Sequence, residues 1–252
     1  MAIRAVVFDL FDTLVDISMQ NLPRIEVDGR SIPSTAGVLH QVVSARVEVD
    51  FERFVGVLTQ VDREFRETRY ERGLELPTLE RFEAVVEQLG LDAPELPGIL
   101  TDTHMGMIRQ QVSVPGHHER VVGELGRRVC LGLCSNFSHS EMALGVLDDY
   151  GLRSHLDALV ISDAIGIRKP RSEIFNAVLD ELGVEPAEAL HVGDSLRADI
   201  GGAAPLGIRT AWITRRIPDS ERALREYEGP PPDHVIADLA EIDDLLNGLS
   251  CG

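Results

Sequence analysis

Seven polar residues could carry chemistry, because each lies at or shortly after the end of a short apolar run. They are Asp9, Ser135, Asn136, Asp163, Lys169, Asp194 and Asp199. A hard cation such as Mg²⁺ takes oxygen ligands from one or two carboxylates, substrate and water, and Asp9 and Asp194 offer such carboxylates. Each residue alone also has a structural explanation, since Asp commonly caps helices and Ser-Asn commonly forms turns. Together they favour phosphoryl transfer with a carboxylate nucleophile, a charge-neutralising metal, and Lys169 and Ser135 on the phosphoryl oxygens.

Lysine usage singles out Lys169. The 24 basic residues comprise 23 arginines and this one lysine. A bias toward arginine would explain the count, and so would a site that needs a compact ammonium with three donors, which a planar guanidinium cannot replace. The count alone leaves both interpretations open.

Short apolar, β-branched runs predict the elements that position these residues. The runs are Ile3 to Phe8, Val129 to Cys134, Ala158 to Ile161, Leu190 to Val192, Ile208 to Ile213 and, near the end, His234 to Ile236. Helical spacing of apolar residues lies between them, for example at Ala143, Val146, Leu147 and Tyr150. Alternating strands and helices predict an α/β fold with a doubly wound parallel sheet, in which ligands bind beyond the carboxyl ends of the strands.

About a hundred residues of different character follow the first strand. Helical patterns occur at Phe51 to Phe65 and at Leu79 to Leu89, with Pro77-Thr78 as a start signal for the second. Asp28-Gly29 could form a tight hairpin between two short flanks. A loop of this length is too long for a simple crossover. We therefore predict an all-helical cap domain at 17–112, inserted into an α/β core made of 1–16 and 113–252.

Composition excludes several classes of protein. The net charge of −18 would repel a nucleic-acid backbone, and the apolar runs are shorter than the ~20 residues of a membrane-spanning helix. Arg4 interrupts the first apolar run, so no signal peptide is expected and a cytoplasmic location is predicted. The cysteines suit neither a disulfide framework nor a zinc site, and Cys130 and Cys134 are expected in a buried strand. A monomer is the default expectation.

Four segments together resemble the haloacid dehalogenase (HAD) superfamily of aspartate-nucleophile hydrolases. The segments are Ala5 to Leu14, Leu133 to Asn136, Gly166 to Pro170 and Gly193 to Asp199. The resemblance implies a Rossmann-like HAD core with an inserted helical cap, and a Mg²⁺-dependent hydrolase that forms an aspartyl-phosphate on a small phosphorylated metabolite.

The resemblance also implies a role for each matching residue. Asp9 would be the nucleophile, Lys169 would neutralise charge, and Ser135, Asn136 and Thr13 would bind the phosphoryl oxygens. Metal ligands would come from Asp9, the backbone carbonyl of Phe11, Asp194 and Asp199.

One position departs from the phosphatase pattern. Phosphatases of the superfamily usually carry a second aspartate two residues after the nucleophile, where this chain has Phe11 and places Asp12 one residue later. Loss of a general acid/base costs about 10²- to 10⁴-fold in rate. Either the substrate has a good leaving group or another group, with Asp12 the first candidate, acts as the catalytic acid.

Two alternatives stay open. Dehalogenating members of the superfamily resemble this chain in having an apolar residue at the position of Phe11, since halide leaves without a proton. Their segment corresponding to Gly193 to Asp199, however, usually lacks the paired acids present here as Asp194 and Asp199. A catalytically weakened binding protein is the second alternative, and the intact Asp9 and Lys169 argue against it. His117, His118 and His139 are expected on solvated surface.

Overall fold

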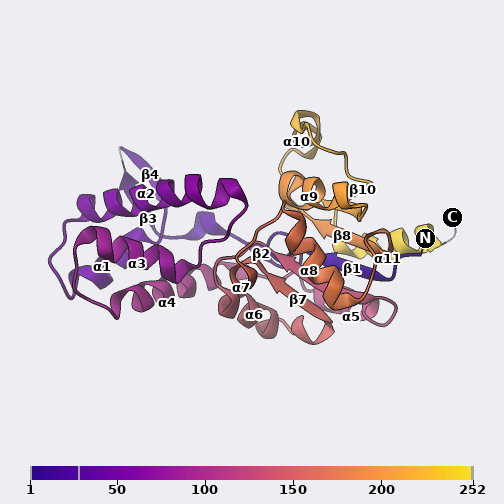
Figure 1. Cartoon of the computed structure of the whole chain (residues 1–252), viewed down its shortest axis with the longest axis horizontal. Helices are drawn as coiled ribbons and strands as arrows, with labels where there is room; N and C mark the ends of the chain where they lie inside the picture. Colours follow the sequence, from indigo (N-terminus) through magenta and orange to yellow (C-terminus); the bar gives the residue numbers. More distant parts are fainter. Residues whose placement is uncertain (1, 28, 251–252) are drawn as a thin grey trace. The chain divides into compact units, whose positions relative to one another are not determined.

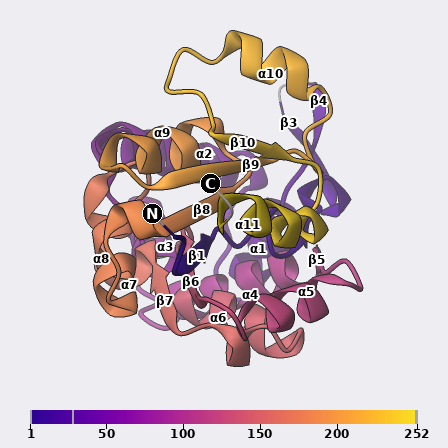
Figure 2. The same ribbon diagram turned by 90° about the vertical axis from the view of Figure 1, so that its right-hand side faces the viewer.

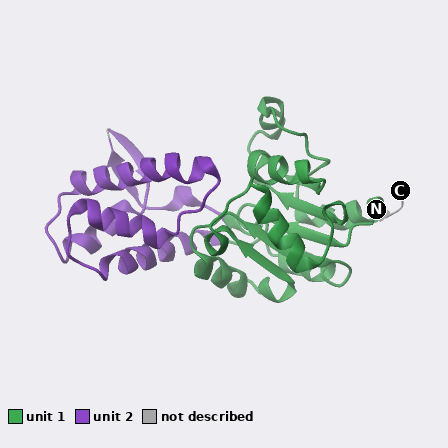
Figure 3. Ribbon diagram, viewed as in Figure 1, with its two compact units in different colours: residues 1–16, 113–252 green, residues 17–112 purple. Residues whose placement is uncertain are grey.

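The computed structural model describes residues 2–27 and 29–250, which divide into two compact units. Unit 1 consists of residues 1–16 and 113–252, and unit 2 of residues 17–112 (Figure 3). The chain thus leaves unit 1 after its first strand and returns to it almost a hundred residues later. Each unit is described by itself.

Unit 1 is built on a six-stranded sheet with the order β10-β9-β8-β1-β6-β7 (Figure 1). All its neighbouring strands pair in parallel. Its strands are β1 (Ala5–Phe8), β6 (Cys130–Ser135), β7 (Ala158–Ile161), β8 (Ala189–Gly193), β9 (Arg209–Ile213) and β10 (His234–Ile236). The six predicted runs all form strands, and the prediction of an α/β fold is confirmed.

Helices cover both faces of this sheet, with α8 and α9 on one side and α5 and α11 on the other (Figure 2). The α-helices of unit 1 are α5 (His118–Leu125), α6 (Ser140–Asp149), α7 (Ser162–Ile165), α8 (Ser172–Leu182), α9 (Gly201–Ala203), α10 (Ser220–Glu226) and α11 (Ile242–Ser250). Short 3-10 turns are η3 (Arg153–His155), η4 (Pro186–Glu188), η6 (Ala204–Leu206) and η7 (Leu239–Glu241), and η5 (Leu196–Ile200) is a π-helical turn. The fully buried Phe175 anchors α8 against the sheet.

The strand order explains why the candidate catalytic residues lie around the end of β1. The chain runs outward from β1 through β6 to β7, and then crosses back to β8 on the other side of β1. β1 is therefore flanked by β6 and β8, with Phe8 in register with Leu133 and Val192. Residues that follow the carboxyl ends of these strands lie at one edge, where ligands bind in doubly wound sheets.

Unit 2 is largely helical. It contains α1 (Ala36–Ser44), α2 (Phe51–Thr68), α3 (Thr78–Leu89), α4 (Leu96–Arg109) and the turns η1 (Met19–Asn21) and η2 (Tyr70–Arg72). Apolar side chains from all four α-helices form one core, which includes Leu39, Phe54, Phe82 and Leu100. The two helices expected from spacing are α2 and α3.

Unit 2 is not purely helical, because β3 (Arg24–Val27) and β4 (Arg30–Pro33) pair antiparallel. This is the expected hairpin, although Asp28 lies outside the described residues. Gly29 has a φ of 72°, a left-handed conformation that glycine adopts at little cost. A separate two-stranded pair is formed by β2 (Asp16–Ile17) and β5 (Val112–Ser113).

The cysteines and the helix lengths can also be compared with the sequence predictions. Cys134 is buried in β6 as predicted, but the prediction was wrong for Cys130, which is exposed as the first residue of the strand, whereas the five residues after it are buried. Cys251 lies outside the described residues. Within 2–27 and 29–250, no helix combines the length and apolarity that crossing a membrane requires.

Candidate active site

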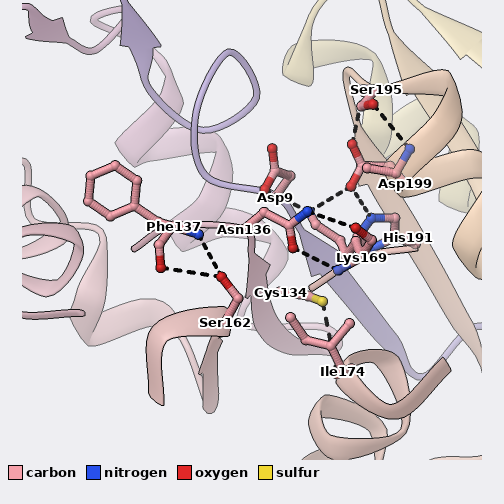
Figure 4. Close-up of polar contacts among 11 residues, drawn as sticks. Asp9, Cys134, Asn136, Phe137, Ser162, Lys169, Ile174, His191, Ser195 and Asp199 are labelled. Atoms are coloured by element: carbon pink, nitrogen blue, oxygen red, sulfur yellow. Dashed lines mark hydrogen bonds and ion pairs between the residues drawn. The ribbon is translucent and has the colours of Figure 1, made fainter. Parts of the chain in front are cut away.

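A buried lysine joins two carboxylates at the carboxyl edge of the sheet (Figure 4). The Lys169 Nζ donates to Asp9 Oδ1 and to Asp199 Oδ1, each at 2.7 Å. Lys169 is only 4% exposed, so these ion pairs form largely out of water. Burial alone would lower the pKa of Lys169, but the carboxylates of Asp199 and Asp9 outweigh it and raise that pKa above its ordinary value. The ammonium is therefore a fixed positive charge beside Asp9.

The position of Asp199 depends on β8 and on the π-helical turn η5. His191 Nε2 lies 2.9 Å from Asp199 Oδ1, and the backbone N–H of Ser195 donates to Asp199 Oδ2 at 3.0 Å. An added Cβ at Gly193 would lie 2.2 Å from Asp199 Cγ, so only glycine lets the carboxylate approach the strand this closely. Burial would raise the pKa of Asp199, but Lys169 and the His191 hydrogen bond hold it well below its usual range.

A third carboxylate adds negative charge that Lys169 does not balance. Ligand oxygens of Asp9, Asp194 and Asp199 all lie within 4.8 Å of one another. Burial, followed by repulsion from Asp9 and Asp199, raises the pKa of Asp194 to about 8. Burial also raises the pKa of Asp9, despite the neighbouring ammonium.

This donor set fits a hard divalent cation. Carboxylate oxygens are the ligands that Mg²⁺ prefers, and a cation would remove the repulsion that keeps a proton on Asp194 near neutral pH. The backbone of Asp194 is fixed, because Trp212 Nε1 donates to its carbonyl at 2.7 Å. Asp9, Asp194 and Asp199 could therefore hold the ion.

Two buried hydroxyls lie at or after the carboxyl ends of β6 and β1. Thr13 and Ser135 are 0% and 1% exposed, and neither hydroxyl oxygen has a hydrogen-bond partner in the described part of the chain. An unsatisfied buried hydroxyl costs about 1 to 3 kcal/mol. Both are thus suited to donate to an anionic ligand.

The amide of Asn136 holds the loop that carries Lys169. Its Nδ2 donates to the Lys169 carbonyl at 2.9 Å, and its Oδ1 accepts from the Lys169 N–H at 2.7 Å. The side chain therefore positions the lysine, and a direct contact of Asn136 with substrate stays a prediction.

A sequence model of the haloacid dehalogenase-like hydrolases matches residues 3–207. The chain belongs to this family. The pyrimidine 5'-nucleotidase YjjG of Escherichia coli is 26% identical over 167 residues, which are 66% of this chain and 69% of that protein. The glyceraldehyde 3-phosphate phosphatase of Pyrococcus furiosus is 26% identical over 254 residues, or 97% and 93% of the two chains. The structure of a 2-haloacid dehalogenase from Pseudomonas syringae superposes with a TM-score of 0.70 at 21% identity, over 98% and 99% of the two chains, and shares the fold.

Phe11 and Asp12 of this HAD-like hydrolase point to different partners. The Phe11 ring packs against Phe137, with ring centroids 4.8 Å apart. Asp12 has a φ of 57°, a left-handed conformation uncommon outside glycine and asparagine-like residues. Its Oδ1 accepts from Arg216 Nε at 3.2 Å. The aromatic pair thus takes the position where phosphatases of this superfamily usually place an acid.

Several outcomes at this hydrolase's sheet edge were not predicted. Asp163 accepts from the Ser140 N–H at 2.7 Å, so its carboxylate caps α6. His118 is fully buried, and the expectation of solvated surface was wrong for it because its ring lies inside unit 1, with Nδ1 2.8 Å from the backbone carbonyl oxygen of Leu14. The contacts of His191 with Asp199 and of Arg216 with Asp12 were not predicted either. A histidine two residues before Gly193 on the same strand face was the available signal for His191, whereas nothing in the sequence links Arg216 to Asp12.

Proposed function

We propose that this chain is a Mg²⁺-dependent phosphomonoester hydrolase that acts on small phosphorylated molecules through an aspartyl-phosphate on Asp9. The observation that carries the proposal is the cluster of Asp9, Asp194 and Asp199 around the buried Lys169. The names of two relatives, a 5'-nucleotidase and a glyceraldehyde 3-phosphate phosphatase, specify small phosphate esters.

Asp9 is the nucleophile in this proposal. One of its carboxylate oxygens attacks phosphorus, the bond from phosphorus to the ester oxygen breaks, and the leaving group departs as an alkoxide or phenolate that takes its proton from solvent. Water then attacks the phosphorus of the aspartyl-phosphate, and the bond from phosphorus to the Asp9 oxygen breaks. Phosphate is released, the water gives up a proton to solvent, and the carboxylate is restored. A bound Mg²⁺, held by Asp9, Asp194 and Asp199, would offset the repulsion between the attacking carboxylate and the phosphate.

Lys169, Ser135 and Thr13 stabilise the transferred group. The ammonium of Lys169 already lies against Asp9 and needs no rearrangement to neutralise a phosphoryl oxygen nearby. The buried hydroxyls of Ser135 and Thr13 supply the further donors. Fixed donors of this kind act more strongly in a water-poor site than in solution. Asn136 contributes by holding the Lys169 backbone.

The leaving group must depart without help from residue 11. Phe11 has no proton to give, and the carboxylate of Asp12 is paired with Arg216. We infer that activated esters, such as aryl or acyl phosphates, react far faster than alkyl phosphates. Residues 17–112 are assigned the role of a substrate-selecting cap as part of the same proposal.

Release of phenolate from an aryl phosphate tests the proposal. Turnover should require Mg²⁺ and should be lost in Asp9→Asn, which keeps the size of the side chain but removes the nucleophilic charge. The exposed Asp148→Asn, whose carboxylate pairs with Arg153 on the surface, is the matched control and should remain active. Equal, metal-independent rates in wild type and Asp9→Asn would exclude the proposed mechanism.

Dehalogenation is a second candidate, favoured by the packing of Phe11 on Phe137. A departing halide needs no proton, so an aromatic pair at this place would suit a 2-haloacid. Asp9 would then displace halide from carbon and form an ester that water hydrolyses. Halide release without metal, together with no release of phenolate, would favour this candidate over the phosphatase.

A further inference from the structure

A second cluster of ligand-type side chains lies in unit 1, apart from the carboxylates around Lys169. His117 and His118 stand at the start of α5, and Asp238 caps the turn η7 after β10. Ligand atoms of the three residues all lie within 4.8 Å of one another. His117 Nε2 is 2.6 Å from Asp238 Oδ1, and His118 Nε2 is 3.8 Å from Asp238 Oδ2.

The ring of His118 is held in the tautomer that binds metal. His118 is 0% exposed, and its Nδ1 lies 2.8 Å from the carbonyl oxygen of Leu14. A carbonyl can only accept, so Nδ1 carries the proton and Nε2 of the neutral ring presents a lone pair. That Nε2 is buried and makes no hydrogen bond to the residues that the structure describes. Metal-binding histidines commonly donate their second ring N–H to a backbone carbonyl in this way.

We propose that His117, His118 and Asp238 bind a divalent transition-metal ion of the Zn²⁺ type. Two imidazoles and one carboxylate are a ligand set typical of zinc sites that leave a fourth position open. Imidazole nitrogen also distinguishes the cluster from the all-oxygen set of Asp9, Asp194 and Asp199, which suits Mg²⁺. Nothing in the proposed hydrolase mechanism uses these three residues.

Small movements would complete the coordination. Zinc bonds of about 2.0 to 2.2 Å place ligand atoms about 3.3 Å apart in a tetrahedron. The two distances to Asp238, 2.6 and 3.8 Å, lie on either side of that value. The side chain of His117 is 38% exposed, so an ion can enter from solvent and keep a water at its open position.

The surrounding charge permits a cation. Arg215 Nε lies 3.8 Å from Asp238 Oδ2, but its terminal nitrogens pair with both carboxylate oxygens of Asp16. With neutral histidines, one guanidinium and two carboxylates leave a net charge of −1. An ion there would link α5 to η7 and hold His118 against Leu14, next to Thr13.

Co²⁺ absorption tests this site without reference to activity. Untagged full-length protein is stripped with chelator and titrated with Co²⁺ in excess Mg²⁺, and Zn²⁺ is then added as competitor. One equivalent should give visible ligand-field bands that Zn²⁺ removes. Asp238→Asn keeps an acceptor for the Ala240 N–H, which now bonds Oδ1 at 2.9 Å, and should weaken binding by at least about tenfold.

Two controls locate the ion. His155→Gln removes a histidine that pairs with Glu119 at the surface, and Asp194→Asn weakens the carboxylate cluster; both should retain the bands. Zn²⁺ should also raise the melting temperature of wild type and not that of Asp238→Asn, which reports on the site even if the spectra are weak. Absence of bands in wild type, equal affinity in Asp238→Asn, or loss of the bands in Asp194→Asn would overturn the proposal.

Discussion

Arg216 Nε lies 3.2 Å from Oδ1 of Asp12, the residue that follows Phe11 in the sequence. Asp12 is the carboxylate next in sequence to position 11, where phosphatases of the superfamily usually have an aspartate, and the guanidinium of Arg216 holds it. Asp12 also takes a left-handed backbone conformation, so the turn after β1 directs Phe11 toward Phe137 and Asp12 toward Arg216. Leaving-group chemistry should therefore respond to residue 11 more than to residue 12.

Phe11→Asp should raise the rate on alkyl phosphates by about 10²-fold and leave aryl phosphates little changed, because a positioned acid matters most for a poor leaving group. The kcat/KM of both ester classes, measured for Phe11→Asp and Asp12→Asn, checks this. Asp12→Asn should change neither class strongly. A large loss on alkyl phosphates in Asp12→Asn would instead identify Asp12 as the working acid.

Lys169→Arg should lower kcat by about 10²-fold or more although it keeps the charge, because a planar guanidinium cannot place one nitrogen between Asp9 and Asp199 as the ammonium does. The 2.7 Å contacts on both sides leave little room for a larger group. Steady-state kinetics beside Arg171→Lys, a partly exposed residue paired with Glu173, provide the comparison. Full activity of Lys169→Arg would refute the need for an ammonium.

Gly193→Ala should displace Asp199, because the added Cβ would lie 2.2 Å from the carboxylate carbon. Overpacking in a core typically costs about 1 to 3 kcal/mol of the free energy of unfolding. We expect a lower denaturant midpoint and weaker activation by Mg²⁺. Gly248→Ala in α11, where nothing lies within 4 Å of the new Cβ, should be neutral or stabilising by up to about 1 kcal/mol.

Affinity for Mg²⁺ should rise with pH up to about 8, the pKa of Asp194 without metal. Below that pH the carboxyl holds a proton that the ion must displace, so the dissociation constant should fall roughly tenfold for each pH unit gained. Calorimetry at pH 7 in two buffers of different ionisation enthalpy should detect about one released proton. Binding without proton release would contradict the prediction, and Asp194→Asn should abolish the release.

The metal-free protein should lose stability as the pH rises toward 8. The unfolded chain releases the Asp194 proton near 3.8, whereas the folded chain keeps it until about 8. Between those values the native state binds more protons, so the free energy of unfolding falls with rising pH. Urea melts of wild type and Asp194→Asn in chelator measure the difference, which should shrink when Mg²⁺ is added. An unchanged slope in Asp194→Asn would exclude this carboxyl as the source.

The strands of unit 1 could be predicted because strands buried on both faces read as continuous apolar runs. Asp9, Lys169 and Asp199 could be found for the same reason, since each follows a strand end or lies in the next loop. Helix α4 was missed, because Pro97, Gly98 and Gly106 weaken its helical pattern. Its residues Leu96 and Leu100 are part of the unit 2 core, a contact that spacing along the chain does not show.

Contacts between distant segments could not be predicted. The sequence shows His118 only as a polar residue at the start of a helix. Its contact with the carbonyl of Leu14, 104 positions away, depends on the tertiary fold. The pairing of Arg216 with Asp12 likewise joins two loops that share an edge only after the sheet forms. Spacing along the chain identifies which residues end a strand, but it does not say which side chains from other strands meet them.

The side chain of Asn136 imitates a peptide group. Its carboxamide offers one acceptor and one donor to the N–H and carbonyl of Lys169, as a neighbouring strand would do in a ladder. The backbone of residue 169 is thus hydrogen-bonded to the residue that follows β6, in the same way as two paired strands are joined. An aspartate in place of Asn136 would be nearly identical in shape but would have no N–H to donate. The bond to the Lys169 carbonyl would then be lost, and only the bond from the Lys169 N–H would remain.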